Sequence, residues 1–351
     1  MGGTLVFTSI GGAAAVTAGA VLAGSIGATT TAELSVRVHP APARMPSNAA
    51  RARTERRSIR RTVAWPSMPL EGRGAYYTRK RAAMEWTLLR AYRGGWPAQF
   101  VRRLGLQRSV RTVEHRIACP RWPKGLRPLR CTFASDLHAG PTTHPTLLDD
   151  AFDTMERAKP DVMFLGGDYI FLDGRHIHQL APRIRRTSAS LAKVAVLGNH
   201  DLWADDELVK RTIEDAGARV LVNECLRLPP PYEMVTVHGL DDPWTGKQEP
   251  KVMEEGGDVR IVVSHAPEGL FVAGDARFDV MLAGHTHGGH IALPGGVPVV
   301  SVGPLGRRFP HGRHDVGQGR TLIVSRGIGG TESAFRWNAD PDVIVVELGP
   351  Q

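Results

Sequence analysis

Aspartate is absent from the first 130 residues, whose only acidic side chains are five glutamates. The same residues contain 23 lysines and arginines, whereas residues 131–351 hold 30 acidic and 21 basic side chains. The formal net charge of +9 therefore describes neither region. Because the larger region is acidic, the sequence excludes a uniformly basic nucleic-acid-binding chain. We expect a basic N-terminal extension and an acidic, histidine-rich body large enough to bury one full core.

Cysteine is also scarce, with three residues that form no CxxC pair (Cys119, Cys131 and Cys225). This count excludes a disulfide-built scaffold and fits a reducing compartment. Cys131 heads an apolar run, and we expect it to fill space in the core rather than to act as a nucleophile.

Charged side chains are absent from residues 1–32. The run Thr4–Ala28 is long enough to span a bilayer, which takes about 20 apolar residues. It is rich in glycine, alanine and threonine, however, and no lysine or arginine precedes it as in a secretory signal. Three interpretations stay open for residues 1–35: a weak membrane anchor, a disordered leader and an unusual export signal. If the segment inserts, the arginines that follow it leave the body in the cytoplasm.

Three further regions follow the leader. Residues 36–76 are rich in arginine and proline without apolar periodicity, which predicts a disordered linker. Residues 77–108 show apolar residues at helical spacing with arginines around them. Such a basic amphipathic helix suits an anionic membrane surface, and it equally suits packing on the body. We expect one globular domain over residues 109–351.

The body alternates apolar, strand-like runs with helical stretches at about residues 144–158, 175–191 and 205–216. Strands become denser in its second half. This order predicts an α/β body with buried sheets rather than an all-parallel, doubly wound fold.

Polar residues follow five of the apolar runs directly. The carboxyl ends of strands are where open α/β sheets bind ligands, so these five ends could converge on one site. Glycines at Gly166, Gly167, Gly198 and Gly284 would let the backbone turn sharply there. The polar residues at these ends are Asp136, His138, Asp168, Asn199, His200, Asp201, His265, His285 and His287.

The residue types indicate metal chemistry. Aspartate and histidine bind divalent ions such as Mn, Fe and Zn, and a carboxylate can bridge two ions. Asp136 and His138, two residues apart, can reach one ion, and His285 and His287 can reach one ion each. Two ions about 3.5–4 Å apart can hold a hydroxide between them and neutralise charge on a phosphoryl group. Five such strand ends in order predict a metal site.

The segments SDLHAG, GGDY, GNHD, SHAPEG and GHTHGGH closely resemble the ordered signature of the calcineurin-like metallophosphoesterases. The resemblance covers about residues 110–349. It implies two packed mixed β-sheets flanked by helices, a four-layer sandwich. It also implies a hydrolase of phosphoester or pyrophosphate bonds that uses a hydroxide bridging two Mn, Fe or Zn ions.

The resemblance further implies a role for each site residue. His200 would face the substrate phosphate and donate a hydrogen bond or a proton to it. Asp201 would support His200 as an acceptor, although an N-terminal helix cap is an equally good interpretation of Asp201. One ion would take Asp136, His138 and His287, the other Asn199, His265 and His285, with Asp168 bridging both.

Within this family, GHTHGG followed by Ile291–Pro294, together with the late segment VSRGIGG, is similar to a membrane-associated branch. That branch includes YkuE-like phosphoesterases and enzymes that hydrolyse UDP-2,3-diacylglucosamine, so a phosphorylated small molecule or a lipid-linked nucleotide is the expected substrate. His290 replaces the usual glutamine, where it could add a ligand or alter substrate contacts. The basic run Arg307–His314 could bind an anionic head group or form a solvated loop.

Two other functions compete with this hydrolase. One is a broad phosphodiesterase or nuclease of the same fold. A nuclease would need to bind nucleic acid, and the basic segment Arg51–Arg61 lacks the interleaved aromatics of a nucleic-acid-binding groove. No specific nucleic-acid partner is therefore expected. A non-catalytic, metal-bound scaffold would typically lose His200 or a ligand residue, and this chain keeps them.

Overall fold

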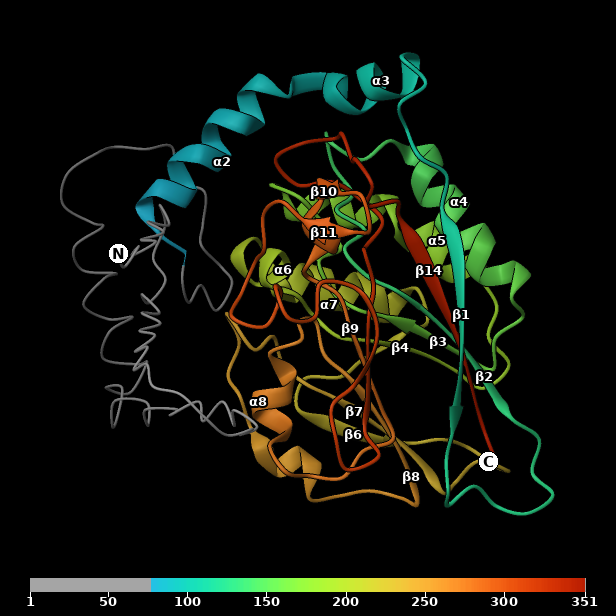
Figure 1. Cartoon of the computed structure of the whole chain (residues 1–351). Coiled ribbons are helices and arrows are strands. Elements are labelled where there is room, and N and C mark those ends of the chain that lie inside the picture. The colour runs from blue at the N-terminus through green and yellow to red at the C-terminus, as the bar shows by residue number, and fades with distance from the viewer. Residues whose placement is uncertain (1–76, 351) are drawn as a thin grey trace, which may run out of the picture. The chain divides into compact units, whose positions relative to one another are not determined.

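Two six-stranded β-sheets form the centre of the computed structural model, which describes residues 77–350 (Figure 1). In the first sheet the strand order is β1-β14-β2-β3-β4-β5, and only the β14–β2 pairing is antiparallel. Its strands are β1 (Arg111–Ala118), β14 (Asp342–Gly349), β2 (Leu129–Ala134), β3 (Val162–Leu165), β4 (Ala192–Ala195) and β5 (Arg219–Val220).

The second sheet has the order β12-β13-β9-β8-β7-β6 and is parallel from β13 to β7, with antiparallel strands at both edges. A separate two-stranded ribbon, β10–β11, follows β9 in the chain. These strands are β12 (Gly312–Asp315), β13 (Thr321–Val324), β9 (Val280–Ala283), β8 (Val259–Val263), β7 (Val235–Gly239), β6 (Glu224–Arg227), β10 (Ala292–Leu293) and β11 (Val297–Pro298).

The core lies in three layers because successive side chains of a strand point to opposite faces. In β3, Val162 and Phe164 belong to the cluster between the sheets, whereas Met163 and Leu165 belong to the cluster on the outer face. In β9, Val280 and Leu282 face inward in the same way. Both faces of the central strands are therefore buried, which explains their continuous apolar runs.

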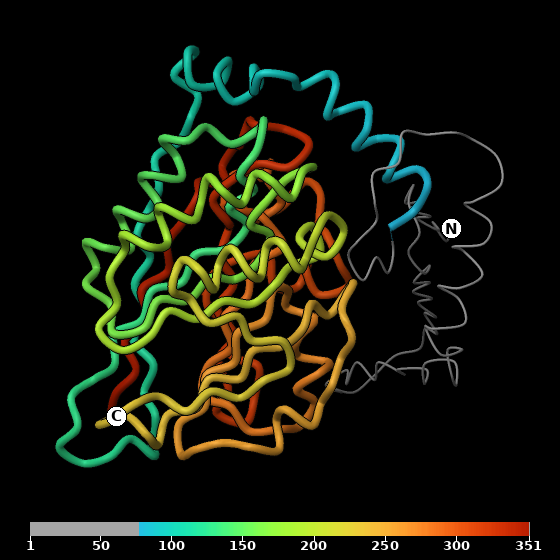
Figure 2. The backbone as a smooth tube through the Cα atoms, turned by 180° about the vertical axis from the view of Figure 1, so that it is seen from behind, coloured from blue at the N-terminus to red at the C-terminus, as the bar shows by residue number. Residues whose placement is uncertain are grey.

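Helices cover both outer faces. The cluster outside the first sheet joins it to α4 (Pro145–Arg157), α5 (Ala181–Arg186) and α7 (Asp206–Asp215), and the cluster outside the second joins it to α8 (Gly269–Ala273). Figure 2 shows the body from behind. The result is four layers, helix–sheet–sheet–helix, and the predicted fold class is confirmed. The remaining helices are α2 (Arg79–Ala91), η1 (Arg93–Gly95), α3 (Trp96–Arg103), η2 (Gly174–Gln179), α6 (Asn199–Trp203), η3 (Pro250–Met253) and η4 (His287–Gly289).

Two predicted helices are broken. The helix expected over residues 175–191 is two short elements, η2 and α5, and Pro182 stands in the first turn of α5, where proline is best tolerated. The helical segment expected over residues 77–108 divides into α2 and α3. Gly94 and Gly95 lie between α2 and α3 and have φ values of 76° and 65°. These left-handed conformations interrupt the helix.

The N-terminal helices contact the body. Arg81 on α2 forms an ion pair with Glu332 at 2.8 Å, and the hydroxyl of Tyr92 donates to the backbone carbonyl of Glu332 at 2.8 Å. On α3, Arg102 donates to the hydroxyl of Thr146 at 3.0 Å. Within residues 77–350, none of the helices is long and apolar enough to cross a membrane. The predicted leader and linker (residues 1–76) lie outside the described residues.

We predict that Phe164→Ala lowers the free energy of unfolding by about 3–5 kcal/mol, because it opens a cavity between the two sheets. Phe164 is fully buried, whereas Phe100 on α3 is 54% exposed. Phe100→Ala is thus the matched control and should change the free energy by less than about 0.5 kcal/mol. Denaturant unfolding of the full chain measures both values. Equal losses in the two variants would contradict the layered core.

Candidate metal centre

The five predicted strand ends meet at one place. Three loops of the first sheet, after β2, β3 and β4, supply Asp136, His138, Asp168 and Asn199. Two loops of the second sheet, after β8 and β9, supply His265, His285 and His287. The structure therefore brings all seven predicted ligand residues together, and each of them is less than a tenth exposed.

Asp136, His138 and His287 form the first group. The Nε2 atoms of His138 and His287 lie 3.2 Å apart, and the Nε2 atom of His287 is 3.4 Å from Oδ1 of Asp136. The carboxylate of Asp136 is fixed by the backbone N–H of His285, which donates at 3.0 Å to its Oδ2. One nitrogen or oxygen of each residue thus points to a common centre.

The second group surrounds His265. Its Nε2 atom lies 3.3 Å from Oδ2 of Asp168, 3.2 Å from Oδ1 of Asn199 and 3.1 Å from Nδ1 of His285. Asp168 also joins the first group, because the same Oδ2 is 3.6 Å from Nε2 of His138. Its other oxygen, Oδ1, accepts the backbone N–H of His200 at 2.8 Å. Asp168 therefore lies between the two groups.

The hydrogen bonds of the histidine rings make this site suitable for binding cations. Nδ1 of His138 faces the carbonyl of Ile170 at 3.3 Å, and Nδ1 of His265 faces the carbonyl of Gly166 at 2.9 Å. A ring nitrogen beside a carbonyl carries the proton, so in the neutral, metal-binding form of either ring Nε2 directs a lone pair into the site. Those lone pairs meet carboxylate and amide oxygens, which are also acceptors. Acceptors this close together require positive charge between them.

The pKa shifts of His265 and Asp168 also indicate that the cluster needs positive charge. Burial lowers the pKa of the His265 imidazole, but the charges of Asp168 and Asp136 together raise it well above its usual value. Against the cost of burial, His265 in turn holds the pKa of Asp168 well below its usual value. Asp168 thus keeps a negative charge in a buried site when a positive charge stands beside it.

The ligand loops have unusual backbone conformations. Asp136, His138, Asp168, His285 and His287 all have positive φ values, between 42° and 70°. Each such residue costs on the order of 1–3 kcal/mol when the surrounding structure must hold it there. We expected the neighbouring glycines to make these turns, but of the four only Gly167 has a positive φ, of 89°.

The other glycines are needed for close approach. A Cβ atom added at Gly198 would lie 2.3 Å from Oδ1 of Asp168, and one added at Gly284 would lie 2.1 Å from the hydroxyl of Ser135. Both distances are shorter than van der Waals contact allows. These glycines therefore let the loops of neighbouring strands come together around the ligand side chains.

His200 lies at the edge of the cluster on α6. Its ring centroid is 4.8 Å from that of His138, 5.6 Å from Phe171 and 5.0 Å from Trp203. Burial among these rings lowers the pKa of His200 well below its usual value. The imidazole is therefore neutral near pH 7, and its N–H can donate a hydrogen bond.

Asp201 does not have the partner that we predicted. Instead of supporting the His200 ring, its carboxylate accepts three backbone N–H groups, from Asp168 at 2.8 Å, Tyr169 at 2.9 Å and Gly198 at 2.9 Å. The bond to Gly198 caps the first turn of α6. Asp201 thus fixes the backbone of the two loops that carry Asp168 and His200. Burial, with the charge of Asp168, raises the pKa of Asp201 to about 8.

Arg336 is a neighbour of the site that the sequence did not indicate. Its guanidinium is buried and donates to the carbonyls of Gly329, Arg326 and Ala339. The same group lies 2.9 Å from Nδ1 of His287. Arg336 follows no strand end, so only its position in an apolar stretch could have suggested burial.

His290 turns away from the ligands. Its Nε2 atom faces the backbone carbonyl of Ser333 at 3.0 Å, and its ring centroid is 5.5 Å from that of His287. In the basic run Arg307–His314, His311 contacts the carbonyl of Gly296 at 3.1 Å, while Arg307 and Arg308 are exposed. This run therefore adjoins the β10–β11 ribbon.

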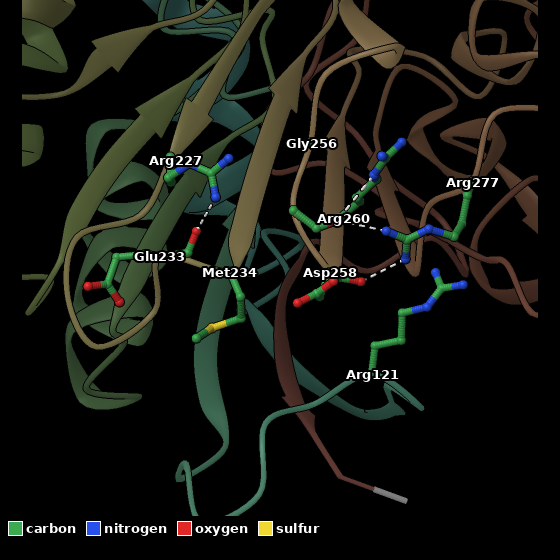
Figure 3. Close-up of a pocket in the computed structure, with 9 residues that line it drawn as sticks. Arg121, Arg227, Glu233, Met234, Gly256, Asp258, Arg260 and Arg277 are labelled. Carbon is green, nitrogen blue, oxygen red and sulfur yellow. Dashed lines mark hydrogen bonds between the residues drawn. The ribbon is translucent and has the colours of Figure 1, made fainter.

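An arginine-lined hollow of about 600 Å³ lies apart from the ligand cluster, at the end of the second sheet where β8 begins (Figure 3). Three of its four arginines donate hydrogen bonds to backbone carbonyls of the surrounding loops. Arg227 donates to the carbonyl of Glu233, Arg260 to that of Met253 and Arg277 to that of Asp258. We therefore assign these arginines a structural role, which is to hold the loops at this end of the second sheet.

We predict that Arg336→Gln weakens Mn²⁺ binding about tenfold, because the buried carbonyls of Gly329, Arg326 and Ala339 lose their donor and the loop beside His287 is held less firmly. Calorimetric titration of Mn²⁺ into the metal-stripped chain measures this change, and circular dichroism verifies folding. Arg320→Gln is the control, since Arg320 also donates to backbone carbonyls but lies in another part of the body. A folded Arg336→Gln variant with unchanged Mn²⁺ affinity would disprove the role.

Comparisons with known proteins identify relatives of this chain. A family model described as calcineurin-like phosphoesterase matches residues 129–289. The phosphodiesterase YaeI of Escherichia coli K12 is 30% identical over 241 residues, which cover 67% of this chain and 87% of that protein. The uncharacterized metallophosphoesterase YkuE of Bacillus subtilis 168 is 27% identical over 247 residues, covering 68% and 85%. The solved structure of a dimetal phosphatase from Danio rerio, LOC 393393, is similar over 58% of this chain and 88% of that chain, with a TM-score of 0.37 and 13% identity. The chain belongs to the calcineurin-like phosphoesterase family.

Proposed function

We propose that this protein hydrolyses phosphoester or pyrophosphate bonds at two divalent metal ions held where the strand ends of its two sheets meet. The observation that carries the proposal is the buried cluster in which Asp168 lies between two groups of ligand side chains. When bound, two such ions supply a nucleophile from water at neutral pH and neutralise charge on the phosphoryl oxygens.

The chain's own residues would divide the work as follows. Asp136, His138 and His287 would hold one ion, and Asn199, His265 and His285 the other, with Asp168 shared between them. The backbone carbonyls that face Nδ1 of His138 and of His265 support this assignment, because a neutral ring that donates from Nδ1 offers Nε2 to the site.

His200 would act on the substrate rather than on the ions. Its ring lies beside Asp168 and His138 at the edge of the cluster. Since burial keeps it neutral, it can donate its N–H to a phosphoryl oxygen and pass a proton to the leaving oxygen. Asp201 would contribute by fixing the backbone on which Asp168 and His200 stand.

A lipid-linked nucleotide, such as UDP-2,3-diacylglucosamine, is the substrate that we propose. Residues 291–306, which follow the ligand His287 closely, contain no charged side chain. Several of their large apolar side chains are exposed. Such a surface beside a phosphoryl-transfer site suits a substrate with an apolar tail.

A broad phosphodiesterase is the second candidate. It is favoured by the similarity to YaeI, which is described as a phosphodiesterase. The two candidates differ in their dependence on the lipid portion of the substrate, and a soluble diester is cleaved equally well under either one.

Metal removal provides the first test. We expect chelation to abolish hydrolysis of bis-p-nitrophenyl phosphate and Mn²⁺ to restore it. Asp168→Asn should lower the restored activity about a hundredfold or more, because the shared carboxylate loses its charge. Asp153→Asn, at a site 45% exposed, is the control. If restored Mn²⁺ gives no turnover, or if the two variants behave alike, the proposed function is wrong.

His200 provides the second test. We predict that His200→Gln lowers kcat about 10²–10⁴-fold while two Mn²⁺ ions still bind, because the lost group is a proton donor rather than a ligand. Steady-state kinetics and metal analysis of the same preparation separate these effects. His178→Gln, at an exposed histidine, should leave kcat unchanged. A parallel loss of metal and activity would instead assign His200 to the metal site.

The substrate is tested by product analysis. We expect the full chain with Mn²⁺ to release UMP from UDP-2,3-diacylglucosamine, since cleavage of the pyrophosphate separates the nucleotide from the lipid phosphate. Chromatography of the aqueous phase detects UMP, and the Asp168→Asn variant is the blank. Absence of UMP in a preparation that cleaves bis-p-nitrophenyl phosphate would refute the lipid-nucleotide substrate and leave the phosphodiesterase.

A further inference from the structure

A continuous group of large apolar side chains is exposed beside the metal centre. We call this group the apolar rim, and its members are between 40% and 65% exposed. Single exposed apolar residues are ordinary, but a gathering of this kind marks a surface that meets another apolar phase. The members of the apolar rim are Ile291, Leu293, Val297, Val299, Val300, Val302 and Trp337.

The rim is attached directly to the ligand loop. The backbone N–H of Trp337 donates to the carbonyl of His290 at 3.1 Å, and that of Ala292 donates to the carbonyl of Trp337 at 2.8 Å. A Cβ atom added at Gly289, two residues after the ligand His287, would lie 2.3 Å from a carbon of Pro298. A surface that touches the rim therefore lies next to the metal centre.

The other end of the rim approaches the second ligand group. A Cβ atom added at Gly303 would lie 2.6 Å from the ring of Trp244. The ring centroid of Trp244 is 5.1 Å from that of His285. The rim thus borders both groups of ligand residues.

Positive charge flanks the rim. Residues 291–306 carry no charge, and they are followed at once by Arg307 and Arg308, both of which are exposed. His311, from the same run, is held against Gly296 in the turn of the β10–β11 ribbon. Apolar side chains beside exposed arginines match the two layers of an anionic membrane surface, its acyl chains and its head groups.

The N-terminal helices lie toward the same end of the body as the ribbon (Figures 1 and 2). There α3 exposes Trp96, Phe100 and Leu104. Arg102 and Arg103 close the same helix. Helix α3 is thus a second element at this end of the body that exposes both apolar and basic side chains. Two such elements fit a membrane-facing side of the molecule better than a local groove for a peptide.

We propose that the apolar rim docks on an anionic lipid bilayer and places the metal centre at the membrane surface. The rim inserts its valines and Trp337 among the acyl chains, while Arg307 and Arg308 contact lipid phosphates. This inference deepens the proposed lipid-linked substrate, because a docked enzyme reaches such a phosphate without drawing the lipid into water.

A single label on the rim tests this directly. The full chain carries Val300→Cys with an environment-sensitive fluorophore, in a Cys225→Ser background because that thiol is partly exposed. Vesicles of phosphatidylcholine and phosphatidylglycerol are then added. We expect a blue shift of emission and quenching by doxyl-labelled lipid. Because the label reports its own surroundings, membrane contact by residues 1–76 alone does not produce this signal.

The matched control carries the label at Gln318, in the exposed turn before β13. Since β13 is parallel to β9, this turn lies at the opposite end of the sheet from the ligands, and its label should stay in water. A Val300 label that stays in water, whether or not the chain sediments with the vesicles, overturns the proposal. A shift that depends on protein concentration without vesicles assigns the rim to a second copy and also overturns it.

Two further measurements complete the test. Arg307→Gln with Arg308→Gln should reduce the shift on phosphatidylglycerol vesicles to that on phosphatidylcholine alone. Equal shifts on both lipids for the unsubstituted pair would overturn the role of these arginines. Hydrolysis of bis-p-nitrophenyl phosphate by the unlabelled full chain is measured alongside, so a failure of docking is distinguished from a failure of catalysis.

Discussion

The structure depends on one electrostatic constraint, the burial of lone pairs that face one another. The imidazoles of His138 and His265 each give one nitrogen to a backbone carbonyl and turn the other toward acceptor atoms. Without positive charge among them, these groups would repel one another in a region that water hardly reaches. The loops, the helix cap at Asp201 and the guanidinium of Arg336 hold side chains in an arrangement that only a cation makes favourable.

This constraint explains where the backbone is strained. Five of the predicted ligand residues adopt positive φ, and non-glycine residues avoid that region because the Cβ atom clashes with the chain. The parallel strands deliver each residue at the same edge of the sandwich, and the left-handed turn then directs its side chain into the site. The strain is compensated by the closely packed sheets behind it, where the central strands are buried on both faces.

The sequence predicted the sheets and the gathering of the polar residues that follow the strands, because both follow local rules. Buried strands are apolar runs, and the residues after them are polar only where they serve a site, as at Asp168 and His265. The contacts of Asp201 and Arg336 do not follow such local rules and were not predicted. The partners of Asp201 are backbone N–H groups from two loops, and Arg336 meets His287 from 49 residues away. The helix predicted over residues 175–191 was wrong because apolar spacing alone cannot show where a proline divides it.

The origin of the ligand residues has a mechanical consequence. Asp136, Asp168 and Asn199 belong to the first sheet, whereas His265, His285 and His287 belong to the second. An ion held by residues of both sheets ties the two halves of the sandwich together at one edge, as a cross-link does. The free energy of ion binding then also opposes separation of the sheets. The same few bonds between the ions and their ligands would thus serve both catalysis and the stability of the fold.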